Sequence, residues 1–346
     1  MTTNNITKGF PYVNKDYYKV YVRTNTYNQA SYIIECINGV AMQQTDFPFV
    51  HHIMDDCSTD GEQEVIKTYL NNNCDMENAE YYDNDICSIT IAKNKSNPNC
   101  TFAVYFLKKN IYKDRKKRTE LYSLWREVCS YEALCEGDDY WIDAKKLQKQ
   151  IDFLDHNQNY TLCFHQAMEH FEYSNIDDRI FKEIKDGDYD SSSIFGDWII
   201  ATASVVFRTS IMQSSLYKQY TTNKKIIFGD TPLFLTCAHY GKVRGMSQTM
   251  SVYRRQEDGE TQAYMERNPR KEIKLCVHNY EIYRIFGDNE KQFRSFVIKY
   301  YIHPLLRVFI GSVIHRRKIQ YGALFQLIKT EPCSTIIELS KIKKWK

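Results

Sequence analysis

Phe49-Val50-His51-His52-Ile53-Met54, followed directly by Asp55-Asp56-Cys57-Ser58-Thr59-Asp60-Gly61, is the stretch that decides the fold. The first six residues form a short, mostly apolar run that is typical of a buried strand, and the next seven are polar residues that favour a turn. Apolar side chains then recur on one side of a predicted helix, at Val65, Ile66, Tyr69 and Leu70. Strand, acidic turn and helix together make one unit of an α/β fold.

The same pattern recurs on both sides of this stretch. Residues 19–24 have strand character and lead into the turn Thr26-Tyr27-Asn28 and a further helix. Downstream, residues 101–107 and 131–135 are expected strands, separated by a helix with Leu121 and Trp125 on its inner face. This alternation predicts a mainly parallel central sheet that is covered by helices on both faces.

A third polar turn, Glu136-Gly137-Asp138-Asp139-Tyr140-Trp141, follows the strand at 131–135. Short acidic clusters are usually solvated loops that cap the next helix, and that interpretation stands for either acidic turn alone. However, the carboxyl ends of parallel strands meet at one edge of the sheet, so all three turns are expected to lie together. Like charges gathered there need a cation or a ligand, which favours a binding site.

Composition excludes several classes of protein. The 346 residues are 43% hydrophobic and 26% charged, as in a globular protein with a substantial core, and the net charge of +3 gives no reason to expect nucleic-acid binding. The start, MTTNNITKGF, lacks a signal-peptide pattern, and no apolar run approaches the ~20 residues of a membrane span. The eleven cysteines include no C-x-x-C pair, so reduced, mostly buried thiols are expected. G-x-G and P-loop phosphate motifs are also absent from the sequence.

In order and spacing, the three turns resemble the motifs of glycosyltransferase family 2, of the non-processive bacterial type. The resemblance implies a GT-A fold and an inverting enzyme that transfers a single sugar from a nucleotide-diphosphate-sugar donor, with UDP-sugars among the candidates. It implies that Asp56 holds the base of the donor and that Asp139 ligates Mn²⁺ or Mg²⁺. The further donor-binding residues that it implies are Thr26, Tyr27, Asn28, Asp55 and Asp138.

Two later segments extend the resemblance. Phe228-Gly229-Asp230-Thr231-Pro232-Leu233 is similar to the catalytic-base motif of the family, which implies that Asp230 takes the proton from the acceptor hydroxyl. The alternative is a favourable charge at a helix N-terminus, worth up to ~1 kcal/mol at a surface. Val252-Tyr253-Arg254-Arg255 resembles a segment near the diphosphate, with Arg254 as a donor-binding residue or, alternatively, an ordinary surface arginine. Arg23 departs from the family, which usually has an apolar residue there.

The predicted organisation is a GT-A catalytic domain at 1–255 and a mainly helical extension at 256–346. The resemblance implies a glycan or lipid-linked glycan acceptor, a role in bacterial surface polysaccharide synthesis and a cytoplasmic location. A peripheral contact with the inner face of the membrane is one interpretation of the C-terminal region, because an apolar stretch from Phe296 to Ile310 is followed by His315-Arg316-Arg317-Lys318 and by the basic end of the chain. A helix packed on the core is the simpler interpretation of the apolar stretch. A non-catalytic binding relative of the same fold is the alternative function.

Overall fold

The computed structural model describes residues 9–11, 17–173, 176–256, 268–287, 291–314 and 320–341. The chain divides into two compact units. The first comprises residues 1–214 and 236–255, and the second comprises residues 215–235 and 256–346. Residues 215–235 thus group with the C-terminal helices rather than with the sheet. The division into domains at 1–255 and 256–346 stays a prediction.

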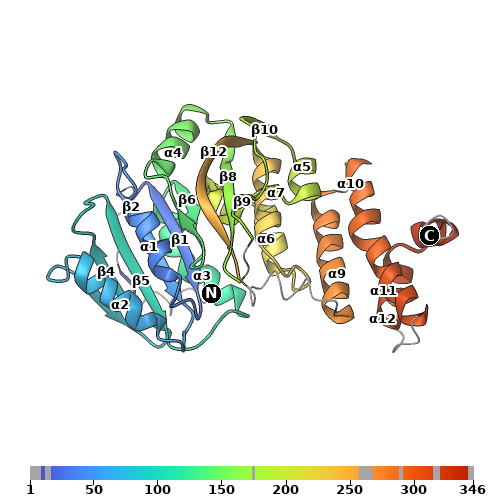
Figure 1. Ribbon diagram of the computed structural model, residues 1–346, viewed down its shortest axis with the longest axis horizontal. Helices are drawn as coiled ribbons and strands as arrows, with labels where there is room; N and C mark the ends of the chain where they lie inside the picture. The colour runs from blue at the N-terminus through green and yellow to red at the C-terminus, as the bar shows by residue number, and fades with distance from the viewer. Residues whose placement is uncertain are drawn as a thin grey trace. The chain divides into compact units, whose positions relative to one another are not determined.

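A mixed sheet organises the first unit (Figure 1). Its centre is parallel and consists of β6 (Tyr131–Leu134), β1 (Val20–Thr26), β2 (Phe49–Asp55) and β5 (Cys100–Leu107), in that spatial order. These are the four strands that the sequence predicts. The α/β class with a mainly parallel central sheet is therefore confirmed.

Antiparallel pairs flank the parallel centre. Beyond β5 lie β4 (Cys87–Lys93) and β3 (Glu80–Asp83), which form a hairpin in a region where the sequence carries no clear pattern. On the other side, β11 (Val206–Arg208) runs antiparallel between β6 and β8 (Tyr160–Phe171). Four further strands complete this side. Of these, β12 (Lys242–Arg255) is parallel to β8, β10 (Gly187–Tyr189) and β7 (Tyr140–Trp141) are antiparallel to β12, and β9 (Arg179–Ile180) is antiparallel to β8.

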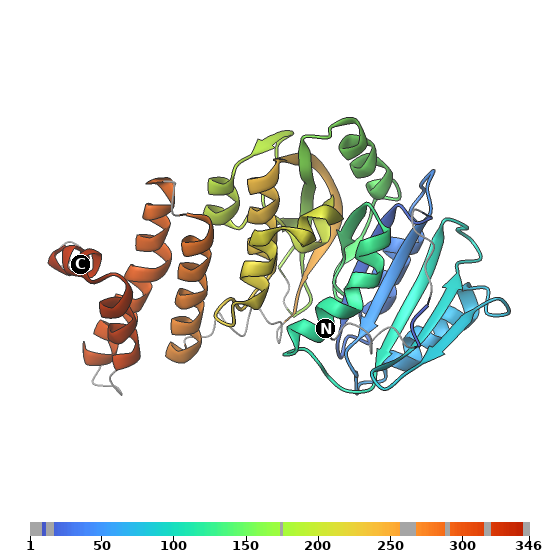
Figure 2. The ribbon, with the colours of Figure 1, turned by 180° about the vertical axis from the view of Figure 1, so that it is seen from behind.

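Helices cover both faces of the sheet, as their apolar periodicity requires. On the face seen in Figure 1, α1 (Ile33–Ala41), α2 (Glu62–Asn73) and α4 (Lys146–His156) bury their apolar sides against the strands. On the opposite face, seen in Figure 2, α3 (Arg115–Val128) packs Leu121 and Trp125 into a second core. All eleven cysteines are free and nine of them are buried, which confirms the expected thiols.

A buried ionic cluster explains why an arginine occupies position 23. Glu132 on β6 is fully buried, and its carboxylate accepts hydrogen bonds from Arg23 Nε at 2.8 Å and Arg126 Nε at 2.7 Å. Burial opposes ionisation of Glu132, but the two guanidinium groups hold the pKa of its carboxyl below the ordinary value. Arg23 is thus an internal partner of the strand that leads into the acidic turn.

Replacing Glu132 with glutamine is expected to lower the free energy of unfolding by about 3–5 kcal/mol near neutral pH, because two buried guanidinium charges lose their partner. A depressed pKa contributes stability above the unfolded-state value of about 4.3, and that contribution is lost as pH falls through the folded-state pKa. The difference between wild type and Glu132→Gln should therefore shrink in acid, as measured by urea denaturation at several pH values. Glu64→Gln, which breaks the exposed pair with Lys67, is the control and should change stability by less than about 0.5 kcal/mol.

The second unit is helical within the described residues. Its elements are α6 (Ser215–Thr222), the first part of α7 (Asp230–Tyr240), α9 (Pro269–Phe286), α10 (Lys291–Val297), the π-helical turn η3 (Ile298–Ile302), α11 (His303–Ile314), α12 (Tyr321–Thr330) and α13 (Pro332–Ser340). Residues 293–314 form a helical stretch that is long and apolar enough to cross a membrane by length and composition, although Arg294, Lys299 and Arg307 keep it from being a continuous apolar run. One side of this stretch, including Tyr301, Ile302 and Leu305, is buried in the core that it forms with α9 and α12, as in the central helix of a helical unit.

Candidate active site

The three polar turns meet at one edge of the sheet, as the sequence predicts. Thr26 at the end of β1 pairs in register with Asp55 at the end of β2. The backbone N–H of Asp56 donates to the carbonyl of Thr26 at 3.0 Å, and the N–H of Gly137 donates to the carbonyl of Asn25 at 3.1 Å. The ends of β1, β2 and β6 are thus joined by their own main chains.

Glu62, at the start of α2, fastens the first two turns together. Its buried carboxylate accepts hydrogen bonds from Gln29 N and Ser58 Oγ, at 2.9 and 2.8 Å, and is also hydrogen-bonded with the Thr26 hydroxyl. Burial raises the pKa of Glu62. Sequence reasoning missed this residue because an acid in the first turn of a helix is ordinarily a surface charge.

The turn after β1 adopts a conformation that suits its residues. Asn28 has φ of 54°, in the left-handed region that asparagine tolerates, and its Oδ1 accepts a hydrogen bond from Thr59 N at 2.8 Å. The N–H of Asn28 donates to Ser58 Oγ at 2.9 Å. Tyr27 is left with 48% of its side chain exposed, at the edge where the three turns meet. The three turns thus leave this aromatic ring accessible to solvent.

The two aspartates after β2 have different surroundings. Asp55 is fully buried, and its Oδ1 accepts from Ser58 N at 3.2 Å and Gln63 Nε2 at 2.5 Å, so it shapes the turn. Asp56 Oδ1 accepts from the backbone N–H of Ile111 at 2.6 Å, and burial raises the pKa of Asp56. The segment after β5 therefore forms one wall beside Asp56, which the sequence did not indicate.

The acidic turn after β6 has no room for a side chain at position 137. A Cβ on Gly137 would lie 2.4 Å from Gln29 Oε1 and 2.5 Å from Thr26 Oγ1. The carboxyls that follow are crowded and shielded from water. Burial and the neighbouring Glu136 raise the pKa of Asp138 to about 6, and burial together with Asp138 raises the pKa of Asp139 well above its usual value. A cation bound here would relieve that unfavourable charge.

Arg254 on β12 anchors the acidic turn from the side. Its backbone N–H donates to Asp139 Oδ1 at 3.0 Å, and its Nε donates to the carbonyl of Asp138 at 2.8 Å. The guanidinium is also paired with Glu35 and Glu172. Arg254 is only 6% exposed, so it is not an ordinary surface arginine. Its contacts join the site to α1 and to the residue that follows β8.

The carboxylates of Asp138 and Asp139 are of the kind that binds a hard divalent cation together with the phosphates of a substrate. Within the described residues, no group of three or more His, Cys, Asp or Glu side chains is arranged to hold a metal. Mg²⁺ is commonly held by one or two carboxylates together with substrate phosphates. Asp138 and Asp139 supply such a pair, and because burial and neighbouring carboxylates raise the pKa of both, ionisation of the pair is unfavourable without a cation.

Asp230 begins α7, as predicted, and its Oδ1 accepts a hydrogen bond from Thr231 N at 2.8 Å. Residue 230 belongs to the second unit, whereas the other predicted site residues belong to the first. Its role as a base stays a prediction.

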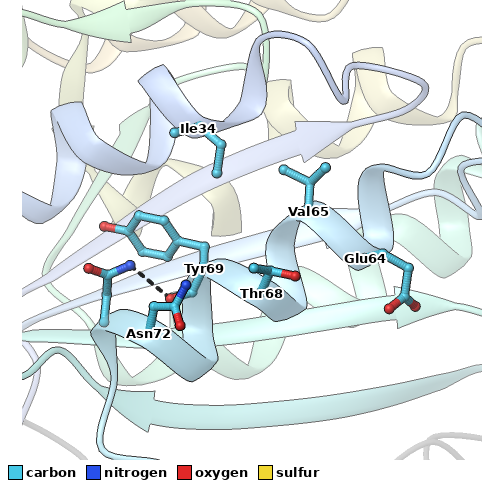
Figure 3. Close-up of a pocket in the computed structure, with 7 residues that line it drawn as sticks. Ile34, Glu64, Val65, Thr68, Tyr69 and Asn72 are labelled. Carbon is cyan, nitrogen blue, oxygen red and sulfur yellow. Dashed lines mark hydrogen bonds between the residues drawn. The ribbon is translucent and has the colours of Figure 1, made fainter.

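A separate hollow of about 470 Å³ lies along α2, and Figure 3 shows Ile34 of α1 facing Val65, Thr68 and Tyr69 across it. It contains none of the predicted site residues.

An α/β sheet with three polar turns at one edge defines the class of protein, and comparisons with known proteins indicate the family that it resembles. The family model described as "Glycosyl transferase family 2" matches residues 22–96, which include the first two turns. Curated relatives include the uncharacterized proteins Mb1547 of Mycobacterium bovis and Rv1520 of Mycobacterium tuberculosis, each 30% identical over 239 residues. The matches cover 68% of this chain and 58% of the relatives' length.

Solved structures agree on the fold. S. aureus TarS 1–349 in complex with UDP-GlcNAc matches with a TM-score of 0.51 and 14% identity, over 84% of this chain and 80% of that one. The mannosyltransferase PcManGT from Pyrobaculum calidifontis, in complex with GDP-Man and Mn²⁺, matches with a TM-score of 0.52 and 13% identity, over 96% and 82%. The chain has the GT-A fold, and its residues 22–96 match glycosyltransferase family 2.

Proposed function

We propose that the protein is a metal-dependent, inverting glycosyltransferase that moves a single sugar from a nucleotide-diphosphate-sugar donor to an acceptor hydroxyl. The observation that carries the proposal is the meeting of Asp56 and the Asp138-Asp139 pair at one sheet edge, inside a family 2 fold. One acidic turn suits a nucleoside and the other suits a cation with a diphosphate. That pairing of chemistries is what a nucleotide-sugar donor requires.

The nucleoside would lie against the first two turns. Asp56 is already fixed by the N–H of Ile111, so its carboxylate is pre-oriented to accept hydrogen bonds from a base. Tyr27 would contact the base or ribose with its exposed ring. Asn28 and Asp55 would act by holding the shapes of the two turns, since their oxygens accept hydrogen bonds from backbone N–H groups in the second turn. Thr26 joins them through Glu62.

The diphosphate would lie over the acidic turn. Mn²⁺ or Mg²⁺, held by Asp139 with Asp138 beside it, would neutralise the charge that develops on the departing nucleoside diphosphate. The solved complex of PcManGT with GDP-Man and Mn²⁺ supports a divalent metal in this fold. Arg254 would keep Asp139 in place through its backbone N–H, and its partly neutralised guanidinium would add a smaller positive contribution.

The chemical step needs a base for the acceptor. Asp230 would take the proton from the acceptor hydroxyl as its oxygen bonds to the anomeric carbon and the bond to the diphosphate oxygen breaks, with inversion at that carbon. A glycan or lipid-linked glycan acceptor in bacterial surface polysaccharide synthesis is the setting that we propose. A lipid-linked acceptor would be met at the cytoplasmic face of a membrane.

A screen of nucleoside diphosphates by thermal shift and calorimetry, with and without Mn²⁺, tests the proposal. Because a ligand that binds only the folded state stabilises it by mass action, at 100 times its Kd the right nucleotide adds about 2.7 kcal/mol and raises the melting temperature. The rise should require the metal. UDP and GDP are the first to compare, since the two solved relatives hold UDP-GlcNAc and GDP-Man. Failure of every nucleotide to bind in the presence of metal would contradict a donor site.

A further inference from the structure

The last helix of the described chain buries its polar side and exposes its apolar side. Thr335 and Glu338 of α13 point into the helical unit, whereas Ile336 and Ile337 face away from it. Amphipathic helices of globular proteins ordinarily do the reverse, because burying apolar surface is what holds them in place. The outward isoleucines therefore indicate a surface that another apolar medium covers.

The helix before it adds to the same kind of surface. On α12, Ala323 and Leu327 are buried, and Tyr321, Phe325 and Ile328 recur at four- and three-residue spacing on the exposed side. The helices α12 and α13 contact each other. We define the C-terminal apolar face as the five exposed side chains of these helices, which range from 53% to 67% exposed, namely Tyr321, Phe325, Ile328, Ile336 and Ile337. Scattered exposed apolar residues are normal, but a group confined to two adjacent helices is a sign of an interaction surface.

The exposed apolar surface lies on a different segment of the chain from the one that the sequence suggested. The apolar run from Phe296 to Ile310 carries the buried residues Val297, Tyr301 and Leu305, which form the core of the helical unit. Those side chains are already covered by protein and have no need of a membrane. The basic segment His315-Arg316-Arg317-Lys318 lies outside the described residues. Apart from Val313 and Ile314 at the end of α11, the exposed large apolar side chains of the described second unit lie on the helices that follow it.

Residues 315–346 differ in charge from the rest of the chain. Residues 315–346 contain eight lysines and arginines against two glutamates, a net charge of +6 in a chain whose total is +3. Both glutamates are already paired, Glu331 with Arg294 at 2.8 Å and Glu338 with His303 at 2.8 Å. Lys329 is exposed beside the face, with its Nζ 6.0 Å from the ring centre of Phe325. The part of the chain that carries the face is thus strongly basic, although the rest of the chain is not.

We propose that the C-terminal apolar face docks on an anionic lipid membrane. An apolar helical surface in a strongly basic part of the chain matches the boundary between lipid headgroups and acyl chains, where aliphatic and aromatic side chains enter and basic groups are attracted to anionic phosphates. A second copy of the chain fits less well, because a two-fold contact through this face would bring its own basic charges together. The proposal concerns the second unit and does not depend on the donor site.

Co-flotation of the full chain with vesicles tests the proposal. Vesicles of phosphatidylcholine with phosphatidylglycerol should carry the protein upward, vesicles of phosphatidylcholine alone should carry much less, and added salt should weaken the binding. The double substitution Ile336→Glu and Ile337→Glu should lower the partition coefficient at least about tenfold, because two apolar side chains that would enter the bilayer become charged. Phe325→Glu is a second, independent variant on the other helix.

Two controls keep the result interpretable. Tyr81→Glu changes an exposed aromatic of β3 in the first unit and should leave vesicle binding unchanged. Circular dichroism and the melting temperature should be the same for each variant as for the wild type, since the replaced side chains are exposed. Equal binding by the wild type and both face variants, or equal binding to neutral vesicles, would overturn the proposal. So would a dimer in sedimentation equilibrium that the face variants convert to monomer, because the face would then join two copies.

Discussion

Replacing Asp139 with asparagine is expected to lower sugar transfer by about 10²- to 10³-fold and to abolish the metal dependence of donor binding. The substitution keeps the shape of the side chain and an oxygen that can accept the hydrogen bond from Arg254 N, but it removes the charge that would hold a divalent cation. The raised pKa of Asp139 shows that its negative charge is poorly compensated by the protein alone. A metal bound there would supply the missing compensation.

The measurement is turnover of nucleotide sugars at several Mn²⁺ concentrations, with nucleotide binding by calorimetry on the same samples. Asp188→Asn is the matched control, because Asp188 is an exposed aspartate of β10 in the same unit, paired with Lys242 at 3.0 Å. It should leave turnover within about twofold of the wild type, since surface substitutions away from a site seldom matter. Wild-type turnover by Asp139→Asn would remove the metal assignment.

The second large effect is expected at Asp230. Asp230→Asn should lower kcat by about 10²- to 10⁴-fold while nucleotide binding stays unchanged, because a general base acts on the acceptor and not on the donor. This pattern separates it from Asp139→Asn, which should lose both. Single-turnover assays with saturating donor, together with calorimetry of nucleotide binding, measure the two quantities.

The competing account of Asp230 makes a different prediction. If its charge only favours the N-terminus of α7, Asp230→Asn should cost up to about 1 kcal/mol of stability and leave kcat unchanged. Glu272→Gln serves as the control, because Glu272 is an acid in the first turn of α9 that pairs with the exposed Arg307. Both variants would then behave alike in chemical denaturation and in turnover. A selective loss of kcat at Asp230 alone would decide for the base.

The frame of the site could be predicted from the sequence because its signals are local. A strand pattern that ends in Asp55-Asp56 specifies both the strand and the edge at which the aspartates lie, and parallel pairing then brings Thr26 into register with Asp55. The same reasoning places the acidic turn after β6 beside them, as the hydrogen bond from Gly137 N to Asn25 O confirms. The start of α7 at Asp230 was likewise marked by Pro232 in its first turn.

The residues that hold the site could not be predicted, because their signals are not local. Glu62 and Glu172 are ordinary acids in the sequence, and only the fold shows that one fastens two turns and the other is paired with Arg254. The wall beside Asp56 comes from a backbone N–H, that of Ile111, which any residue except proline would supply. Contacts of this kind depend on register and approach between segments 30 to 115 residues apart.

The exposed apolar side of α13 shows a different limit of prediction from the sequence. Helical periodicity identifies an apolar stripe but assumes that the stripe is buried. Here Ile336 and Ile337 lie outside and Glu338 inside, held by His303 and Lys341. The contact between Glu338 and His303 of α11 lies on the buried side of the helix, which the hydrophobic pattern alone does not predict.

The buried cluster of Glu132, Arg23 and Arg126 also bears on how this enzyme family diverges. A lineage that loses Glu132 by a single substitution leaves two internal guanidinium groups without their shared carboxylate, which selection would remove unless the fold has stability to spare. Loss of one arginine is less costly, because Glu132 stays paired with the other. Descendants of this chain should therefore keep glutamate at position 132 wherever both arginines are kept.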